Sequence, residues 1–344
     1  MKRRIEDRLE ELSRKFGYAP YKMSRFEEYE LYVRNKDFLQ SDRVITFSGK
    51  DGRLLAMKPD VTLSIVKNAP QTPGDVRKVH YRENVYRMDR DTGNFREILQ
   101  AGIECVGDVG FYEVAEVVCL AAKSLEAIGD DTILSLGHVG LIHHALEASG
   151  LPAAARKQAL DCLRRKREQE LRSLCREHDA DETVLAALLG ARELSDLESM
   201  MDSAGEAWQE LKQIMELLSA RRVRLDFSLG SDMKYYSGLV FKGYARGVPN
   251  SVLSGGQYDR LLEHMGIHAR AIGFAVYLDQ LERLEPDSQW DVDTLLLTGD
   301  AAPSEILAAV EALPGAVLAA KTEPSRRNWK RKAMLEKGEV RYLD

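Results

Sequence analysis

A long helical stretch that separates two blocks of short extended segments constrains the fold of this chain more than any other feature. Between residues 138 and 222 the sequence is dominated by Ala, Leu, Arg and Glu, and only Gly150-Leu151-Pro152 and Gly190 interrupt the helical pattern. Extended patterns occur on both sides of it, at residues 27–66, 79–106 and 223–278. The order predicts an α+β protein in which residues 138–222 are a mostly helical insertion into a strand-rich core.

The two ends of the chain have different patterns. Residues 1–15 predict an amphipathic helix, because Ile5, Leu9 and Leu12 recur at helical spacing. After a linker near residue 285, residues 290–344 show a strand–helix–strand rhythm. We therefore predict a core at residues 1–285 and a small C-terminal α/β segment at residues 290–344. That segment is shorter than an independent domain of typical size, on the order of 100 residues or more.

Composition narrows the class of protein. The chain has 344 residues, of which 44% are hydrophobic and 30% charged, as in an ordinary soluble globular protein. No apolar run approaches the ~20 residues that span a bilayer, and the N-terminus lacks the apolar stretch of a signal peptide. We expect a cytoplasmic protein with no membrane association. The net charge of −6 also weighs against tRNA as a substrate, because proteins that bind polyanions usually carry basic surfaces.

The sequence predicts neither a metal site nor a cofactor. Cys105, Cys119, Cys162 and Cys175 are scattered without Cys-x-x-Cys spacing, which favours reduced thiols over zinc ligands or disulfides. No His-Glu-x-x-His pair is present.

The most informative motif runs from Tyr86 to Gly107. It resembles motif 2 of the class II aminoacyl-tRNA synthetases in its histidyl form, and Arg87 matches the motif's first arginine. A planar, permanently charged guanidinium binds carboxylate or phosphate at two points. Gln100 and Glu104 share a face if they lie on a strand, where they could bind the two ends of histidine. A buried Glu104 needs a partner, and an arginine in a purely structural role is the alternative.

Two further segments complete the resemblance. Lys58-Pro59-Asp60-Val61-Thr62 is similar to a segment of histidyl-tRNA synthetases whose acid and threonine contact the substrate's amino group. On sequence grounds alone, Asp60 could equally cap the start of a helix. Lys234-Tyr235-Tyr236-Ser237-Gly238 resembles the synthetases' histidine-specific signature. The resemblance implies that Tyr236 hydrogen-bonds the imidazole and that Tyr258 closes the pocket.

The chain departs from the synthetase pattern where amino-acid activation takes place. Ser231 stands where the synthetases have an arginine that acts on the histidine carboxylate, and Gln280 stands where motif 3 has its ATP-binding arginine. Tyr277 replaces the second glycine of that motif. A neutral amide cannot supply the charge that stabilises triphosphate oxygens, so we expect no adenylation.

These departures resemble one family, the regulatory subunits of ATP phosphoribosyltransferase, which are paralogues of histidyl-tRNA synthetase. The resemblance covers residues 1–284 and implies a class II synthetase-like antiparallel sheet flanked by helices. It implies a non-catalytic, homodimeric core that assembles with the short-form catalytic subunit. This core would activate the catalytic subunit and mediate feedback by L-histidine in the first step of histidine biosynthesis.

Two alternatives stay open. The first is a divergent histidyl-tRNA synthetase or a synthetase-like ligase, which histidine-dependent pyrophosphate exchange would reveal. The second is a non-enzymatic module that contacts tRNA through the basic residues 326–332. A solvated basic helix, or a patch for an acidic protein neighbour, is the more common explanation of such residues.

Overall fold

The computed structural model describes residues 2–39, 44–88, 92–231, 235–281, 290–325, 327–336 and 338–343. The chain divides into two compact units, residues 1–283 and 284–344, and each is described by itself. Among the described residues, no helix combines the length and apolar character needed to cross a membrane.

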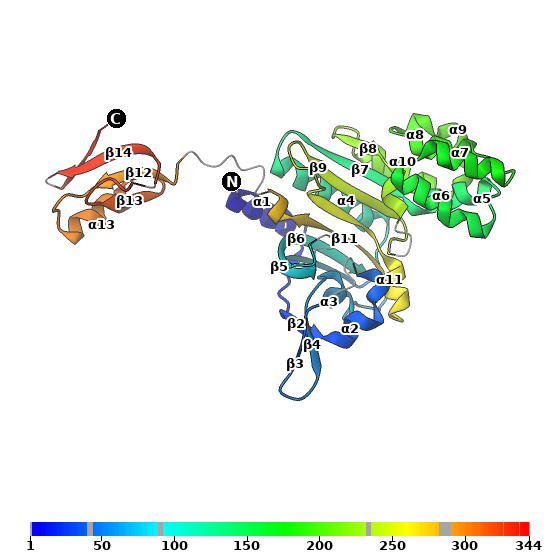
Figure 1. The fold of residues 1–344 in the computed structure, drawn as a ribbon, viewed down its shortest axis with the longest axis horizontal. Helices are drawn as coiled ribbons and strands as arrows, with labels where there is room; N and C mark the ends of the chain where they lie inside the picture. Colours follow the sequence, from blue (N-terminus) through cyan, green and yellow to red (C-terminus); the bar gives the residue numbers. More distant parts are fainter. Residues whose placement is uncertain are drawn as a thin grey trace. The chain divides into compact units, whose positions relative to one another are not determined.

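A large sheet forms the centre of the first unit (Figure 1). Its six middle strands are antiparallel, and each edge strand is parallel to its neighbour. In spatial order the strands are β1 (Ala19–Pro20), β5 (Val76–Met88), β6 (Phe95–Gly107), β11 (Arg270–Tyr277), β10 (Leu253–Gln257), β9 (Leu239–Ala245), β7 (Thr132–His138) and β8 (Val223–Leu225). The predicted antiparallel, synthetase-like sheet is therefore confirmed, with short parallel strands added at its edges.

Helices α1 (Lys2–Lys15) and α4 (Phe111–Ile128) pack against each other on one face of this sheet (Figure 1). Ile5 and Leu9 of α1 are buried, as the helical spacing of apolar residues requires. Ala101 and Ile103 of β6 lie on this same face, next to α1. Because side chains alternate along a strand, Gln100 and Glu104 point to the opposite face.

Smaller elements cover that opposite face. They are a three-stranded sheet of β2 (Phe26–Glu28), β4 (Leu54–Met57) and β3 (Thr46–Ser48), with α2 (Tyr29–Arg34), η1 (Lys36–Phe38), α3 (Thr62–Val66) and α11 (Asp259–His264). Their apolar core includes Tyr32, Ile65 and Leu261. The buried Lys58 pairs with Glu83 of β5 and so connects the segment after β4 to the central sheet.

Residues 139–231 are helical apart from β8 and the connecting loops. They form α5 (Val139–Ala148), α6 (Ala153–Arg165), α7 (Glu168–Glu177), α8 (Thr183–Gly190), η2 (Leu194–Asp196), α9 (Glu198–Met201), η3 (Asp202–Ala204), α10 (Glu206–Leu217) and η4 (Phe227–Ser231). The fully buried Trp208 of α10 belongs to their core. Glu210 of α10 joins this helical region to the central sheet, because its Oε2 lies 2.9 Å from Nε2 of His138 at the end of β7.

The second unit is a four-stranded sheet with one helix. Its elements are β12 (Val292–Leu297), α13 (Pro303–Ala312), β13 (Val317–Ala320), β14 (Trp329–Glu336) and β15 (Glu339–Tyr342), and the strand order is β13-β12-β14-β15. Most of the basic segment 326–332 lies on β14, so the basic-helix alternative is wrong; Arg326 itself lies outside the described residues. Strand geometry prevails here because Ala333 and Leu335, two residues apart, pack into the core with Leu296.

Candidate functional site

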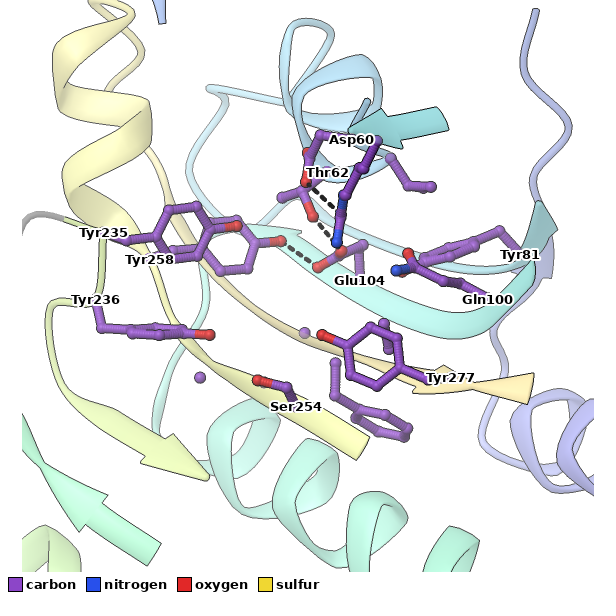
Figure 2. A pocket seen from close by; sticks show the side chains of 17 residues that line it. Asp60, Thr62, Tyr81, Gln100, Glu104, Tyr235, Tyr236, Ser254, Tyr258 and Tyr277 are labelled. Carbon is purple, nitrogen blue, oxygen red and sulfur yellow. Dashed lines mark hydrogen bonds and ion pairs between the residues drawn. The ribbon is translucent and has the colours of Figure 1, made fainter. Parts of the chain in front are cut away.

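A pocket on the face of the central sheet opposite α1 gathers all of the contact residues that the sequence predicted. It encloses about 460 Å³ of space free of protein atoms, part of it open to solvent. The predicted residues that line it are Asp60, Thr62, Arg87, Gln100, Glu104, Tyr236 and Tyr258. They come from separate parts of the chain, and Figure 2 shows their side chains around one space.

Strand register positions the two polar residues of β6. Gln100 pairs with Tyr277 of β11, and Glu104 pairs with Gly273 of the same strand. Residues four apart on a strand share a face and lie about 13 Å from one another. Gln100 and Glu104 therefore share the pocket face but do not lie side by side.

Glu104 lies at the centre of a buried hydrogen-bond cluster. The hydroxyl of Thr62 donates to its Oε1 over 2.8 Å, and the hydroxyl of Tyr258 donates to its Oε2. The partners of Glu104 are therefore these two hydroxyls, and the alternative prediction of an arginine partner is wrong. Burial raises the pKa of Glu104 to about 8, although the bonds from Tyr258 and Thr62 oppose the rise. The group is therefore mostly a neutral carboxylic acid at pH 7.

Asp60 has two roles in the structure. Its Oδ1 accepts a 2.9 Å hydrogen bond from the backbone N–H of Leu63 in the first turn of α3, as the capping interpretation predicts. Its Oδ2 lies 3.7 Å from Nη2 of Arg87. Arg87 is held in turn by a 2.8 Å bond from its Nε to the carbonyl oxygen of Pro59. A negative and a positive side chain thus stand together on one wall of the pocket.

Three tyrosines form the wall beside Glu104. The ring of Tyr235 lies 4.8 Å from that of Tyr236 and 5.8 Å from that of Tyr258, measured between centroids. Burial raises the pKa of Tyr235 and of Tyr258 well above the usual value, and the nearby Glu104 adds to the rise at Tyr258. The phenols of Tyr235 and Tyr258 therefore stay protonated at any physiological pH, and each can donate a hydrogen bond.

Glycines leave the room in which this cluster forms. A Cβ on Gly273 would lie 1.7 Å from Oε2 of Glu104, and a Cβ on Gly256 would lie 2.7 Å from the ring of Tyr236. Any side chain at these two positions would displace a predicted contact residue.

The structure describes the side chain of only one of the two residues that replace synthetase arginines, Gln280 and Ser231. Gln280, on α12 (Leu278–Leu281), lies outside the residues that line the pocket; its Nε2 donates to Oδ2 of Asp279 over 3.0 Å. Its Oε1 is buried and has no hydrogen-bond partner among the described residues. Ser231 ends η4, and its side chain lies outside the described part of the chain.

The sequence did not identify three other lining residues as contacts: Tyr81, Tyr235 and Tyr277. Tyr81 carried no motif signal. Tyr235 adjoins Tyr236, and on a regular strand it would have faced away from the pocket. Tyr277 stands where the synthetase motif has a glycine, and this increase in side-chain size was the signal that could have identified it as a lining residue.

The arrangement fits a small zwitterion with a polar ring. Asp60 suits an ammonium group, Arg87 suits a carboxylate, and Glu104 with the tyrosine hydroxyls suits a ring that both donates and accepts hydrogen bonds. Among the residues that the structure describes, no cluster of three or more His, Cys, Asp or Glu side chains could hold a metal ion.

Comparisons with known proteins agree on the type of fold. Residues 1–281 match the family model described as histidyl-tRNA synthetase. The ATP phosphoribosyltransferase regulatory subunit of Bacillus velezensis is 30% identical over 81% of this chain and 76% of its own length. The histidine–tRNA ligase of Archaeoglobus fulgidus is also 30% identical, over 81% of this chain and 71% of its own length.

A solved structure adds a likeness in three dimensions. A chain of the ATP phosphoribosyl transferase (HisG:HisZ) complex from Thermotoga maritima superimposes with a TM-score of 0.67 at 19% identity. The match covers 81% of this chain and 97% of that one. At this identity the match shows the shared fold.

Proposed function

The chain belongs to the histidyl-tRNA synthetase family, and we propose that it is a non-catalytic regulatory subunit of ATP phosphoribosyltransferase. In this proposal it activates the short-form catalytic subunit and binds L-histidine as the feedback signal of histidine biosynthesis. One observation carries the histidine part: the predicted histidine contacts, from Asp60 to Tyr258, line a single pocket centred on the buried Glu104.

The chemistry of the pocket supports histidine among the amino acids. Glu104, 2% exposed, lies where the pocket would receive the side chain of the ligand. An apolar ligand side chain would leave this buried carboxyl without a polar partner from the ligand. The pocket should therefore discriminate against such ligands, because burying an unpaired polar group costs free energy. An imidazole offers both a donor and an acceptor nitrogen, so it can pair with Glu104 in either protonation state.

The absence of activation chemistry rests on charge. Ser231 and Gln280 replace two arginines of the synthetase pattern, and the amide of Gln280 is bound to Asp279 instead of facing the pocket. Removing one fixed charge that stabilises a developing anion typically costs about 3 kcal/mol in the transition state. Two such losses leave no efficient route to an aminoacyl-adenylate.

Regulation then depends on two states of a complex. Histidine can inhibit only if it binds the inhibited state of the assembly more tightly than the active one. We propose that a homodimer of this chain assembles with catalytic subunits and that occupancy of the pocket biases their equilibrium. The regulatory subunit from Bacillus velezensis, similar over 81% of this chain, supports this assignment.

Reconstitution tests the proposal. Phosphoribosyl-ATP formation by the short-form catalytic subunit from the same genome is measured with and without this chain, across a histidine titration. We expect activity that needs this chain and falls with histidine. Glu104→Ala and Tyr236→Phe should weaken the inhibition at least tenfold, while Tyr342→Phe, in the second unit, should not. Unchanged inhibition in both pocket variants would contradict a regulatory role for this pocket.

Because a histidine–tRNA ligase is 30% identical to this chain, ligase activity is the alternative function that should be tested. Histidine-dependent exchange of pyrophosphate into ATP by the purified chain would establish ligase chemistry. That result would overturn the interpretation of Ser231 and Gln280.

A further inference from the structure

The floor of the pocket consists of small residues between two larger ends. On β11, Gly273, Ala275 and Tyr277 share the pocket face, because they alternate along the strand. At about 3.3 Å per residue, the positions of Gly273 and Tyr277 lie about 13 Å apart. Ser254 and Gly256 of β10 widen the floor, since they pair with Ala275 and Gly273. Glu104 stands at the glycine end, and the tyrosine closes the other.

Charge gives this floor a direction. Within the β5–β6 pair, Val79 lies opposite Glu104, Glu83 lies opposite Gln100, and Arg87 lies further along β5, opposite Arg96. The cationic Arg87 therefore starts from beyond the Tyr277 end of the floor, and its side chain reaches back toward Asp60. In the pose on which the proposal rests, the ligand's side chain points toward Glu104, and its carboxylate lies between the guanidinium of Arg87 and the ring of Tyr277.

We propose that Tyr277 is a specificity-determining residue that limits this pocket to a free α-amino acid. Figure 2 shows its ring between Ser254 and Gln100, across the pocket from Tyr236 and Tyr258. There it fills the space into which any group attached to the ligand's carboxyl carbon would extend. The inference rests on the proposed function, since it assumes that the ligand is histidine.

This role is separate from that of Gln280. Relative to the synthetase pattern, Gln280 replaces a charged residue at a position that does not line the pocket. Tyr277 replaces a glycine, and its ring fills part of the space inside the pocket. Restoring an arginine at position 280 would therefore not admit an acyl-adenylate, an ester or a peptide. A rigid aromatic ring in a packed wall excludes extra atoms effectively, because accommodating them forces strain elsewhere.

The test compares two ligands that differ in the group attached to the carboxyl carbon. L-histidine and the dipeptide L-histidyl-glycine share the ring and the amino group, and their dissociation constants are measured by calorimetry with the full chain. We expect the wild type to prefer L-histidine strongly. Tyr277→Ala should reduce that preference at least tenfold by admitting the dipeptide. Tyr277→Phe should keep the preference, because the ring remains, and so should the control Tyr342→Ala.

The outcomes separate the inference from its premise. If wild type and Tyr277→Ala both bind L-histidine with the same preference over the dipeptide, the role of Tyr277 is overturned and the proposed function stands. If the wild type binds no L-histidine, both are overturned. Tyr277→Val, with a β-branched residue suited to a strand, supplies the same comparison if the alanine variant does not fold.

Discussion

Glu104 and Gly273 lie opposite each other on β6 and β11, and a Cβ at Gly273 would lie 1.7 Å from Oε2 of Glu104. The carboxyl that centres the pocket therefore depends on the lack of a side chain on the neighbouring strand. The same Oε2 accepts the hydrogen bond of Tyr258, so displacing it would also release that phenol.

Gly273→Ala should abolish measurable histidine binding and destabilise the first unit by about 2–3 kcal/mol. The added methyl group forces Glu104 out of position and leaves buried hydroxyls unpaired. Chemical denaturation and calorimetry measure the two effects.

A matched control is Gly190→Ala at the end of α8, where no heavy atom lies within 4 Å of the added Cβ. It should bind histidine as the wild type does. Equal binding by the two alanine variants would contradict the packing argument.

The buried Glu104 should make the stability of the unit depend on pH. Its pKa rises from 4.5 to about 8 on folding, so the folded state binds the proton more tightly than the unfolded state. Stability from this group is fully present below pH 4.5 and is lost as the pH rises through about 8. At about 1.4 kcal/mol per pKa unit, the loss amounts to a few kcal/mol.

Glu104→Gln removes the titrating proton and keeps the size of the side chain. Denaturation midpoints of this variant between pH 5 and pH 9 should fall less steeply than those of the wild type. Parallel curves for the two proteins would show that Glu104 titrates near its ordinary pKa.

The ion pair of Lys58 and Glu83 should be costly to break from one side. The Lys58 side chain is 1% exposed and that of Glu83 is 15% exposed. Lys58→Met leaves a carboxylate without its cation and should cost about 3 kcal/mol in urea denaturation. The double variant Lys58→Met/Glu83→Leu should recover most of that loss, because no unpaired charge remains.

Glu210 should couple the helical region to the start of β9. It pairs with His138 at 2.9 Å and accepts from Nε2 of Gln257 at 3.5 Å, while Oε1 of Gln257 accepts from the N–H of Leu239. Glu210→Ala should therefore speed hydrogen exchange at Leu239, measured by mass spectrometry on peptides covering residues 235–245. The control Glu216→Ala, exposed on the same helix, should leave that exchange unchanged.

Much of the fold could be predicted from local pattern. The hairpin of β5 and β6 followed from extended segments on both sides of a turn, and α1 and α4 followed from helical periodicity and composition. The strand β14 was missed because its run of basic residues hides the alternation that appears only at Ala333 and Leu335. There the burial of two alternate residues outweighs the charge pattern.

The sequence by itself determined the family and the chemical identity of the residues proposed to contact the ligand, because motifs record which side chains stand at which spacing. It could not determine what those side chains do to one another. Tertiary structure decided three such relationships. Glu104 accepts hydrogen bonds from Thr62 and Tyr258, and Asp60 contacts both Leu63 and Arg87. The ring of Tyr277 lines the same pocket. Such contacts join residues far apart in the chain, and their geometry depends on the register of the whole sheet.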